Sequence, residues 1–375
     1  MFRRLAFVLG ALLVAALTWA LYATVRNPPV PLEPPRVAVR VPHADAERTV
    51  ILGGDFAPTD AALPLVRARG FRYPYEATAD LVRAADVAFA NLEAPVTERS
   101  ERFPLYKDYV YKVPSAATEA WQWLGLDVVS LANNHIGDYR DAGLLDTVRS
   151  LDRAGIEHVG AGANETAARQ PVVFDLGGTR VGFLAYLEHR AAFNLYLRLF
   201  AVGDRPGCAQ LNRADVVEDV RRLRPRCDVL IVSVHWGENY APVTRTQEEY
   251  GRFLLSLGVD VVAGHHPHDV QPVEVRDGRA LLYSLGNYAW GAPGHAQLRV
   301  GLLARLHITP RAGPTPARLA GLELVPIATQ NQIVKFQPRP LEPGERGWLD
   351  PFLAQSRARG TNLGWEGASV RVQLH

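Results

Sequence analysis

A series of short apolar segments constrains the fold of this chain more than any other feature. Each is rich in Val, Ile or Leu, which is typical of buried strands. They occupy residues 49–54, 86–91, 127–133, 180–186, 228–236, 259–266 and 280–287. Helical patterns lie between several of them, at residues 75–84, 115–124, 140–154, 214–223 and 246–257. Strands that alternate with helices predict a layered α/β domain in which helices cover the faces of the sheet.

The pattern changes after Asn287. Residues 299–308 and 319–327 have the length and composition of longer strands, which suggests an antiparallel return. Residues 329–375 contain many prolines and glycines and show weak periodicity, so we interpret them as a C-terminal tail. The folded domain is therefore expected over residues 48–328.

The N-terminal segment from Leu5 to Val25 contains twenty-one residues and no charge. A helix of that length spans the hydrocarbon core of a bilayer, about 30 Å thick, so the segment predicts a transmembrane anchor. Arg3 and Arg4 precede it, and the positive-inside rule then leaves residues 1–4 as a cytoplasmic stub. The rest of the chain is expected outside the cell membrane.

A cleaved signal peptide is the alternative to this anchor. The apolar run is longer than a usual signal-peptide core and no clear A-x-A cleavage site follows it, so we favour the anchor. A buried core helix is disfavoured because the segment is apolar on all sides. Residues 26–47 are rich in proline and are interpreted as an extended linker.

The overall charge gives little information about partners. Lys and Arg number 41 and Asp and Glu 39, so the net charge of +2 supports neither nucleic acid nor a membrane surface as a partner. Lys107, Lys112 and Lys335 are the only lysines, and we attach no function to them. Cys208 and Cys227 are too few for a disulfide framework or a four-thiolate zinc site, and whether they form a single bridge stays open.

Polar side chains stand at the ends of the predicted strands. They are Asp55, Asn91, Glu93, Asn133, Asn134, His135, His235, His265, His266, His268 and Asn287. Ligands of open α/β sheets bind at the carboxyl ends of strands, so these residues can converge although they are distant in sequence. Carboxylate and amide oxygens with imidazole nitrogens suit Mn, Fe, Zn or Mg. The set predicts a metal site.

Single residues of this set have simpler explanations. Asp55 could be a turn or capping residue, Asn133 and Asn134 could end a strand, and His235 could be a hydrogen-bonded core histidine. The G-H-H-P-H segment from Gly264 to His268 has no such explanation, because packing does not require three histidines in four positions. Pro267 favours a loop there, in which His266 and His268 can both turn inward.

Six motifs, taken together and in order, resemble the CapA family. They are G-D at 54–55, N-L-E at 91–93, N-N-H-x-x-D at 133–138, H-W-G at 235–237, G-H-H-P-H-x-x-Q at 264–271 and S-L-G-N at 284–287. CapA proteins act in poly-γ-glutamate capsule biosynthesis and are relatives of the calcineurin-like metallophosphoesterases. The resemblance covers residues 49–327. It implies a metallo-dependent phosphatase-like four-layer α/β/β/α sandwich, and it agrees with an N-terminal transmembrane helix.

The resemblance also implies roles for individual residues. Asp55 and His268 would bind a first divalent metal, and Glu93 would bridge it to a second one. The remaining ligands of the second metal would be Asn134, His235 and His266. His135 would be the catalytic acid or transition-state donor. Asp138 could orient the His135 imidazole or cap the helix that follows, and His265 is not expected to be a ligand.

The chain departs from the phosphoesterase pattern at two positions. Those enzymes have D-x-H in the first motif, whereas this chain has Asp55-Phe56-Ala57, so the first metal loses an imidazole. Glu93 stands where they have a bridging aspartate. The first metal site could therefore be weaker or hold a different metal, and phosphoester hydrolysis does not follow from the resemblance.

Three hypotheses for function remain. The first is a membrane-anchored, metal-dependent hydrolase or transferase of poly-γ-glutamate or another envelope polymer. The second is a non-catalytic export or assembly subunit, and the third is a phosphoesterase. The implied partners are the anionic polymer, the membrane through residues 5–25 and membrane synthase subunits, with no nucleic acid. Candidate polymer-binding residues are Asn91, Trp236, Arg245 and Asn287, with Tyr240 and Trp290 nearby; each of the aromatic side chains could equally be core packing.

Overall fold

The computed structural model describes residues 32–43, 47–103, 107–190, 197–291, 299–313 and 315–374. Residues 34–375 form one compact unit. The predicted cytoplasmic stub and transmembrane segment lie outside the described residues. Among the helices in the described ranges, none has both the length and the apolar character that crossing a bilayer requires.

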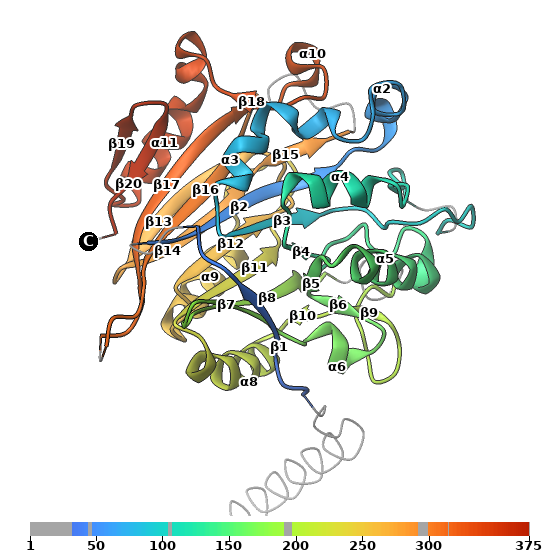
Figure 1. Ribbon diagram of the computed structural model, residues 1–375, viewed down its shortest axis with the longest axis horizontal. Coiled ribbons are helices and arrows are strands. Elements are labelled where there is room, and N and C mark those ends of the chain that lie inside the picture. The colour runs from blue at the N-terminus through green and yellow to red at the C-terminus, as the bar shows by residue number, and fades with distance from the viewer. Residues whose placement is uncertain are drawn as a thin grey trace, which may run out of the picture. The chain divides into compact units, whose positions relative to one another are not determined.

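Two β-sheets form the centre of this unit (Figure 1). The first sheet has eight strands. Its main order is β1 (Arg36–Arg40), β7 (Val172–Leu176), β8 (Thr179–Glu188), β11 (Val229–His235), β12 (Val261–His265), β14 (Arg279–Leu285) and β13 (Val270–Arg276), with β10 (Gln210–Leu211) paired to β8. β8, β11, β12 and β14 run parallel, so their carboxyl ends lie at one edge of the sheet.

The second sheet has ten strands. Its main order is β19 (Leu363–Glu366), β20 (Ser369–Val372), β17 (Arg318–Ala328), β16 (Val300–Thr309), β2 (Arg48–Ala57), β3 (Val87–Leu92), β4 (Val128–Ser130) and β5 (Glu157–Val159). β15 (Asn287–Trp290) pairs with β2, and β18 (Arg339–Pro340) pairs with β17. β2 to β5 are parallel, whereas β16 and β17 form the antiparallel return predicted from the sequence.

The shorter elements connect these strands. The helices are α2 (Leu63–Arg69), α3 (Ala79–Arg83), α4 (Ala117–Leu124), α5 (Arg140–Ala154), α6 (Glu165–Ala168), α8 (Arg213–Leu223), α9 (Arg245–Ser256), α10 (Asn331–Val334) and α11 (Asp350–Ala358). The 3-10 helices of the described ranges are η1 (Asp60–Ala62), η2 (Tyr73–Thr78), η3 (Arg224–Arg226) and η4 (Pro343–Leu349). β6 (Ala161–Gly162) and β9 (Gly207–Cys208) form a separate two-stranded pair.

The apolar strands are buried on both faces, which explains their continuous Val, Ile and Leu runs. On one face of the first sheet, Val232 of β11 packs in a cluster with Val220 of α8 and Leu254 of α9. Its other face meets the second sheet, where Phe183 of β8 stacks on Phe89 of β3 with 5.8 Å between ring centroids. The far side of the second sheet carries α3 and α4 (Figure 1). The predicted α/β sandwich is confirmed, with helices outside two facing sheets.

Two segments outside the predicted domain contribute strands to the sheets. Residues 26–47 were expected as a linker, yet Arg36–Arg40 forms β1, parallel to β7. Residues 329–375 were expected as a tail, yet β19 and β20 extend the second sheet beyond β17. β1 and β19 are edge strands, and β20 lies between β19 and β17. All three are short and partly exposed, so they lack the apolar runs of the central strands.

The two cysteines are free and do not form a bridge. Cys208 lies in the core cluster that includes both sheets, and Cys227 lies in the cluster under α8 and α9. They therefore belong to opposite faces of the first sheet.

Candidate metal centre

The polar strand ends of both sheets meet at one place between the sheets. In the second sheet, Asp55 of β2 is in register with Asn91 of β3 on one side and with Asn287 of β15 on the other. In the first sheet, His235 of β11 is in register with His265 of β12. The parallel direction of these strands brings residues that are distant in sequence to one edge, as the sequence pattern predicted.

A close backbone contact fixes the position of Asp55. Its N–H donates to the carbonyl of Gly286 at 3.2 Å. A Cβ atom on Gly54 would lie only 1.9 Å from that same carbonyl oxygen, so only glycine fits there. The G-D motif therefore has two parts: the glycine allows the approach of β15, and the aspartate faces the centre.

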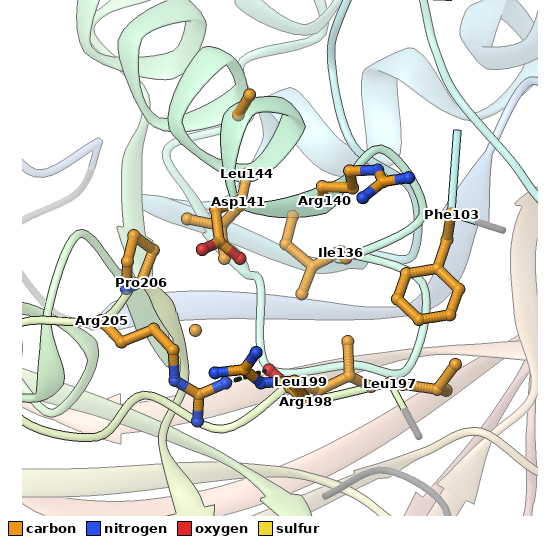
Figure 2. A pocket seen from close by; sticks show the side chains of 13 residues that line it. Phe103, Ile136, Arg140, Asp141, Leu144, Leu197, Arg198, Leu199, Arg205 and Pro206 are labelled. Carbon is orange, nitrogen blue, oxygen red and sulfur yellow. Dashed lines mark hydrogen bonds between the residues drawn. The ribbon is translucent and has the colours of Figure 1, made fainter. Parts of the chain in front are cut away.

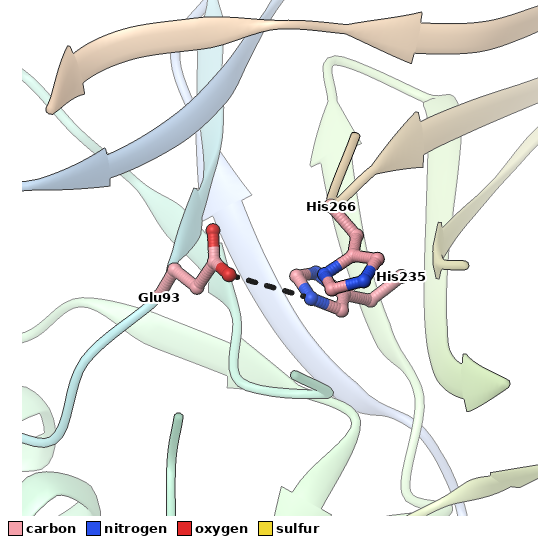
Figure 3. Close-up of side chains that lie close together, drawn as sticks. All are labelled: Glu93, His235 and His266. Carbon is pink, nitrogen blue, oxygen red and sulfur yellow. Dashed lines mark ion pairs between the residues drawn. The ribbon is translucent and has the colours of Figure 1, made fainter. Parts of the chain in front are cut away.

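Glu93, His235 and His266 form one group of potential ligands (Figure 3). One ligand atom from each lies within 4.8 Å of the others. His235 Nε2 is 3.4 Å from Glu93 Oε1, and the His235 and His266 rings have centroids 4.7 Å apart. All three side chains are buried.

Asp55, Glu93 and His268 form a second group under the same 4.8 Å limit. His268 Nδ1 lies 3.5 Å from Asp55 Oδ2, and His268 Nε2 lies 3.9 Å from Glu93 Oε1. Glu93 belongs to both groups. The structure therefore places together the five Asp, Glu and His side chains that the family resemblance implied as ligands, in the implied division.

The Glu93 carboxylate indicates what this centre binds. The residue is fully buried, and neither carboxylate oxygen has a hydrogen-bond partner in the described part of the chain. Burial, with the charge of Asp55, raises the pKa of Glu93 well above its usual value. A buried carboxylate without hydrogen bonds is costly, and a cation held by the two ligand groups would offset that cost. The donor set of carboxylate and imidazole groups fits a divalent metal.

The loop after β12 holds its histidines in an unusual backbone conformation. His266 has φ 96° and His268 has φ 58°, a region that residues other than glycine rarely adopt. The His266 N–H donates to Asp55 Oδ2 at 3.1 Å, which ties the loop to β2. Strain of this kind persists only where the surroundings impose it, and it is frequent at functional sites.

Four asparagines and His265 surround the two ligand groups. Asn134 Oδ1 lies 2.8 Å from His235 Nε2, so this side chain reaches the first group. Two of the other residues contact Asp55: Asn91 donates to Asp55 Oδ1 at 2.8 Å, and His265 Nδ1 lies 3.2 Å from the same oxygen. Asn287 Oδ1 lies 2.9 Å from His268 Nδ1. Asn133 donates to the Leu92 carbonyl at 2.7 Å. Asn91 Oδ1 and both ring nitrogens of His265 are buried without a hydrogen-bond partner among the described residues.

His135 is held by two charged residues. Its Nδ1 lies 2.8 Å from Asp138 Oδ2, and the Lys107 ammonium bonds to Asp138 and to the Asn134 carbonyl, the latter at 2.6 Å. Burial and the charge of Lys107 lower the pKa of His135 to about 4. Asp138 therefore orients the imidazole, and it makes no capping bond to α5.

Sequence reasoning missed Lys107. The rarity of lysine in this arginine-rich chain is the one signal in the sequence that points to it. Tyr111 was missed as well: its ring centroid is 4.4 Å from that of His135, and its N–H donates to Asp138 Oδ2 at 2.7 Å. Trp290, considered as a groove residue, packs against His268 with centroids 4.6 Å apart.

Two of the candidate polymer-binding residues are not at the centre. Trp236 is 1% exposed and lies in the core beneath α9, where its indole N–H donates to the Tyr283 carbonyl at 2.9 Å. Arg245 lies on the outside of α9 and pairs with Glu249 one turn away. A residue next to a motif in the sequence need not face the metal centre, because the side chains of adjacent residues at a strand end point to opposite faces of the sheet.

Fold and site together define an α/β sandwich protein with a candidate metal centre at the strand ends. The chain belongs to the family of bacterial capsule synthesis proteins, PGA_cap, whose profile matches residues 49–291. The resemblance to the CapA family that the motifs indicated is thereby confirmed.

Individual relatives agree with this membership. The capsule biosynthesis protein CapA of Bacillus anthracis is 26% identical over 299 residues, covering 77% of this chain and 70% of the relative. A probable polyglutamine synthesis accessory protein of Mycobacterium tuberculosis is 34% identical over 274 residues, covering 68% and 70%. The crystal structure of the protein TT1561 of Thermus thermophilus covers 68% of this chain and 93% of its own, with a TM-score of 0.38 and 10% identity.

Proposed function

We propose that this protein is a metal-dependent hydrolase or transferase that acts on poly-γ-glutamate or a related envelope polymer. The observation that carries the proposal is the Glu93 carboxylate, which belongs to both groups of potential ligands and is buried without a hydrogen bond from any described residue. Two divalent ions, from the set Mn, Fe, Zn and Mg, would be held by the ligands Asp55, Glu93, Asn134, His235, His266 and His268.

When bound, such ions neutralise charge on the attacked group and lower the pKa of a bound water. The chain's own contribution is the His135 imidazole. Asp138 holds the ring at Nδ1, and the imidazole would be the catalytic acid or transition-state donor. Lys107 keeps Asp138 in place beside the ring.

The substrate class is supported by the relatives. Their names refer to capsule, polyglutamine and PGA synthesis. Poly-γ-glutamate is anionic, whereas the net charge of the protein is only +2. Attraction would therefore come from local arginines and bound metal ions and not from the overall field.

The proposed location is the outer side of the cell membrane, with residues 5–25 as the anchor and the N-terminus in the cytoplasm. The uncharged segment after Arg3 and Arg4 supports it. Membrane synthase subunits would then be partners. Protease treatment of intact spheroplasts should digest the domain; a domain that is protected until the cells are lysed would contradict this location.

Metal analysis of the purified full chain tests the central claim. We expect about two divalent ions per chain, as the two ligand groups require, and loss of most of this metal in Glu93→Gln and His235→Ala. His43→Ala, a histidine at the surface, is the control and should keep its metal. Turnover of poly-γ-glutamate should disappear with chelation. Full activity of the chelated wild type would exclude a metal-dependent reaction.

A non-catalytic assembly subunit is a second candidate. Ala57 stands where the phosphoesterases have a metal-binding histidine, and one relative is named an accessory protein. This candidate predicts that the polymer binds without any bond being cleaved. Turnover that is lost in His135→Ala while metal is retained would exclude it. Turnover of phosphoesters with Mn²⁺ but not of the polymer would favour a phosphoesterase over both.

A further inference from the structure

A cavity that contains none of the candidate metal ligands is lined by the residues that directly follow His135. Its volume is about 410 Å³, within the range of ligand pockets in proteins. Ile136 and Gly137, directly after His135, form part of one wall together with the start of α5 (Figure 2). The segments 197–199 and 205–207 form the opposite wall. The cavity therefore adjoins the candidate catalytic loop without including the metal ligands.

The inner surface of the cavity is mainly aliphatic. Ile136 and Leu199 are buried at its base, and Leu144 of α5 lies above them. Gly137 packs closely against Leu199, since a Cβ on this glycine would be 2.4 Å from Leu199 Cδ2. This part of the wall is therefore closely packed, and the partly exposed apolar surface of the lining comes from Phe103 and Leu197.

Three arginines line the cavity: Arg140, Arg198 and Arg205 (Figure 2). The Arg205 guanidinium donates to the carbonyls of Arg198 at 2.9 Å and Phe200 at 2.8 Å, so it is fixed in direction but has no carboxylate partner among the described residues. Within the same described ranges, Arg198 has no carboxylate partner either. Arg140 is 3.5 Å from Glu101, and both of those side chains are exposed.

Backbone conformation places two of these arginines at the cavity. Arg140 has φ 60° and Arg198 has φ 52°, both in the left-handed region that bulky side chains seldom occupy. Asp141 is the one carboxylate in the lining among the described residues. With Glu101 beside Arg140, three guanidinium groups face two carboxylates at the cavity, so a net positive charge remains there.

We propose that this cavity binds a segment of a γ-linked glutamate chain next to the metal centre. The inference rests on the proposed function for its substrate class. Each residue of such a chain carries one free carboxylate on a short aliphatic spacer. Arginines bind carboxylates in a bidentate manner, and the methylene groups can pack on Phe103 and Leu197, which are partly exposed in the lining. Asp141 opposes binding and limits the affinity of the cavity for the polymer.

Binding of a labelled γ-linked glutamate oligomer to the metal-loaded full chain tests this site. We expect Arg198→Gln and Arg140→Gln each to weaken binding about tenfold, the loss of one charge-assisted contact. Asp141→Asn should strengthen it. Arg67→Gln, an exposed arginine on α2, is the matched control and should bind as the wild type does. Added salt should weaken binding to the wild type more than to Arg198→Gln.

The outcomes separate this inference from the proposed function. If both arginine variants bind the oligomer as tightly as the wild type and still turn over the polymer, the cavity is not the binding site and the proposed function stands. If the wild type neither binds the oligomer nor cleaves or transfers the polymer, both are overturned. We expect equal metal content and equal melting temperature in all variants. A loss of oligomer binding can then be assigned to the cavity and not to unfolding or metal loss.

Discussion

At the scale of single residues, the candidate centre concentrates unfavourable local energies. Glu93 is a buried carboxylate without hydrogen bonds among the described residues, and His266 and His268 have positive φ angles. Strained residues of that kind cost about 1 to 3 kcal/mol each, and a desolvated charge costs more. Such features are typical of sites where a ligand offsets the cost, so these residues point to binding and not to stability of the metal-free fold.

His135 gives a prediction about pH. Its pKa in the folded protein is about 4, below the usual 6.5, because of burial and the charge of Lys107. Between these values the unfolded chain holds more protons than the folded one, so the free energy of unfolding falls as the pH falls. In the metal-free protein, His135 should lower the free energy of unfolding by about 3 kcal/mol between pH 7 and pH 4. Urea unfolding at a series of pH values measures it.

The comparison with His135→Gln isolates that contribution. Glu93, whose pKa is raised by burial, acts in the opposite direction over part of the same range, so the wild-type slope alone is a sum. The variant should lose less stability than the wild type on acidification. Equal slopes for the two proteins would show that His135 does not remain neutral in the folded state.

At the scale of elements, the contact between β2 and the turn before β15 positions the first ligand. Gly54→Ala would place a methyl group 1.9 Å from the Gly286 carbonyl oxygen. The strands must separate, and Asp55 moves with β2. We expect a loss of about 1 to 3 kcal/mol in the free energy of unfolding, and weaker metal binding by titration. Gly364→Ala in β19, where nothing lies within 4 Å, should change neither.

Arg169 joins the end of α6 to α8. Its guanidinium contacts Asp215, Glu218 and Asp219 at 3.0, 2.9 and 2.8 Å and is 4% exposed. Arg169→Met would leave the buried Asp219 without its counter-ion. It should lower the free energy of unfolding, measured in urea, by about 3 to 5 kcal/mol.

Arg221 provides the matched control for Arg169. It is exposed on the same helix α8, and Arg221→Met should stay within about 0.5 kcal/mol of the wild type. Similar losses in the two variants would mean that the Arg169 contacts do not hold α6 and α8 together.

At the scale of the whole molecule, residues 329–375 belong to the fold. Val370 and Val372 of β20 pair with Leu324 and Leu322 of β17 and are buried. A chain ending at Ala328 would expose these leucines and the edge of β17. We expect low solubility, or a loss of several kcal/mol, since each buried valine contributes about 1.5 kcal/mol or more. Soluble yield and urea unfolding measure the effect.

Val370→Asp gives the same test without shortening the chain. It puts a charge into the core and should destabilise the protein by several kcal/mol. Arg371→Ala, which removes only an exposed ion pair with Glu366, should stay close to the wild type. If a chain ending at Ala328 unfolds at the same urea concentration as the wild type, residues 329–375 do not stabilise the fold.

The sequence by itself determined the layered α/β class, the central strands and the residues at their carboxyl ends. These follow from local properties: apolar runs, their alternation with helices, and the parallel direction that brings strand ends to one edge. The tertiary structure alone decided where β1, β19 and β20 lie, that Lys107 reaches His135 and that Trp236 faces the core. Short peripheral strands and side-chain directions depend on neighbours that are distant in the chain, and no local pattern encodes those neighbours.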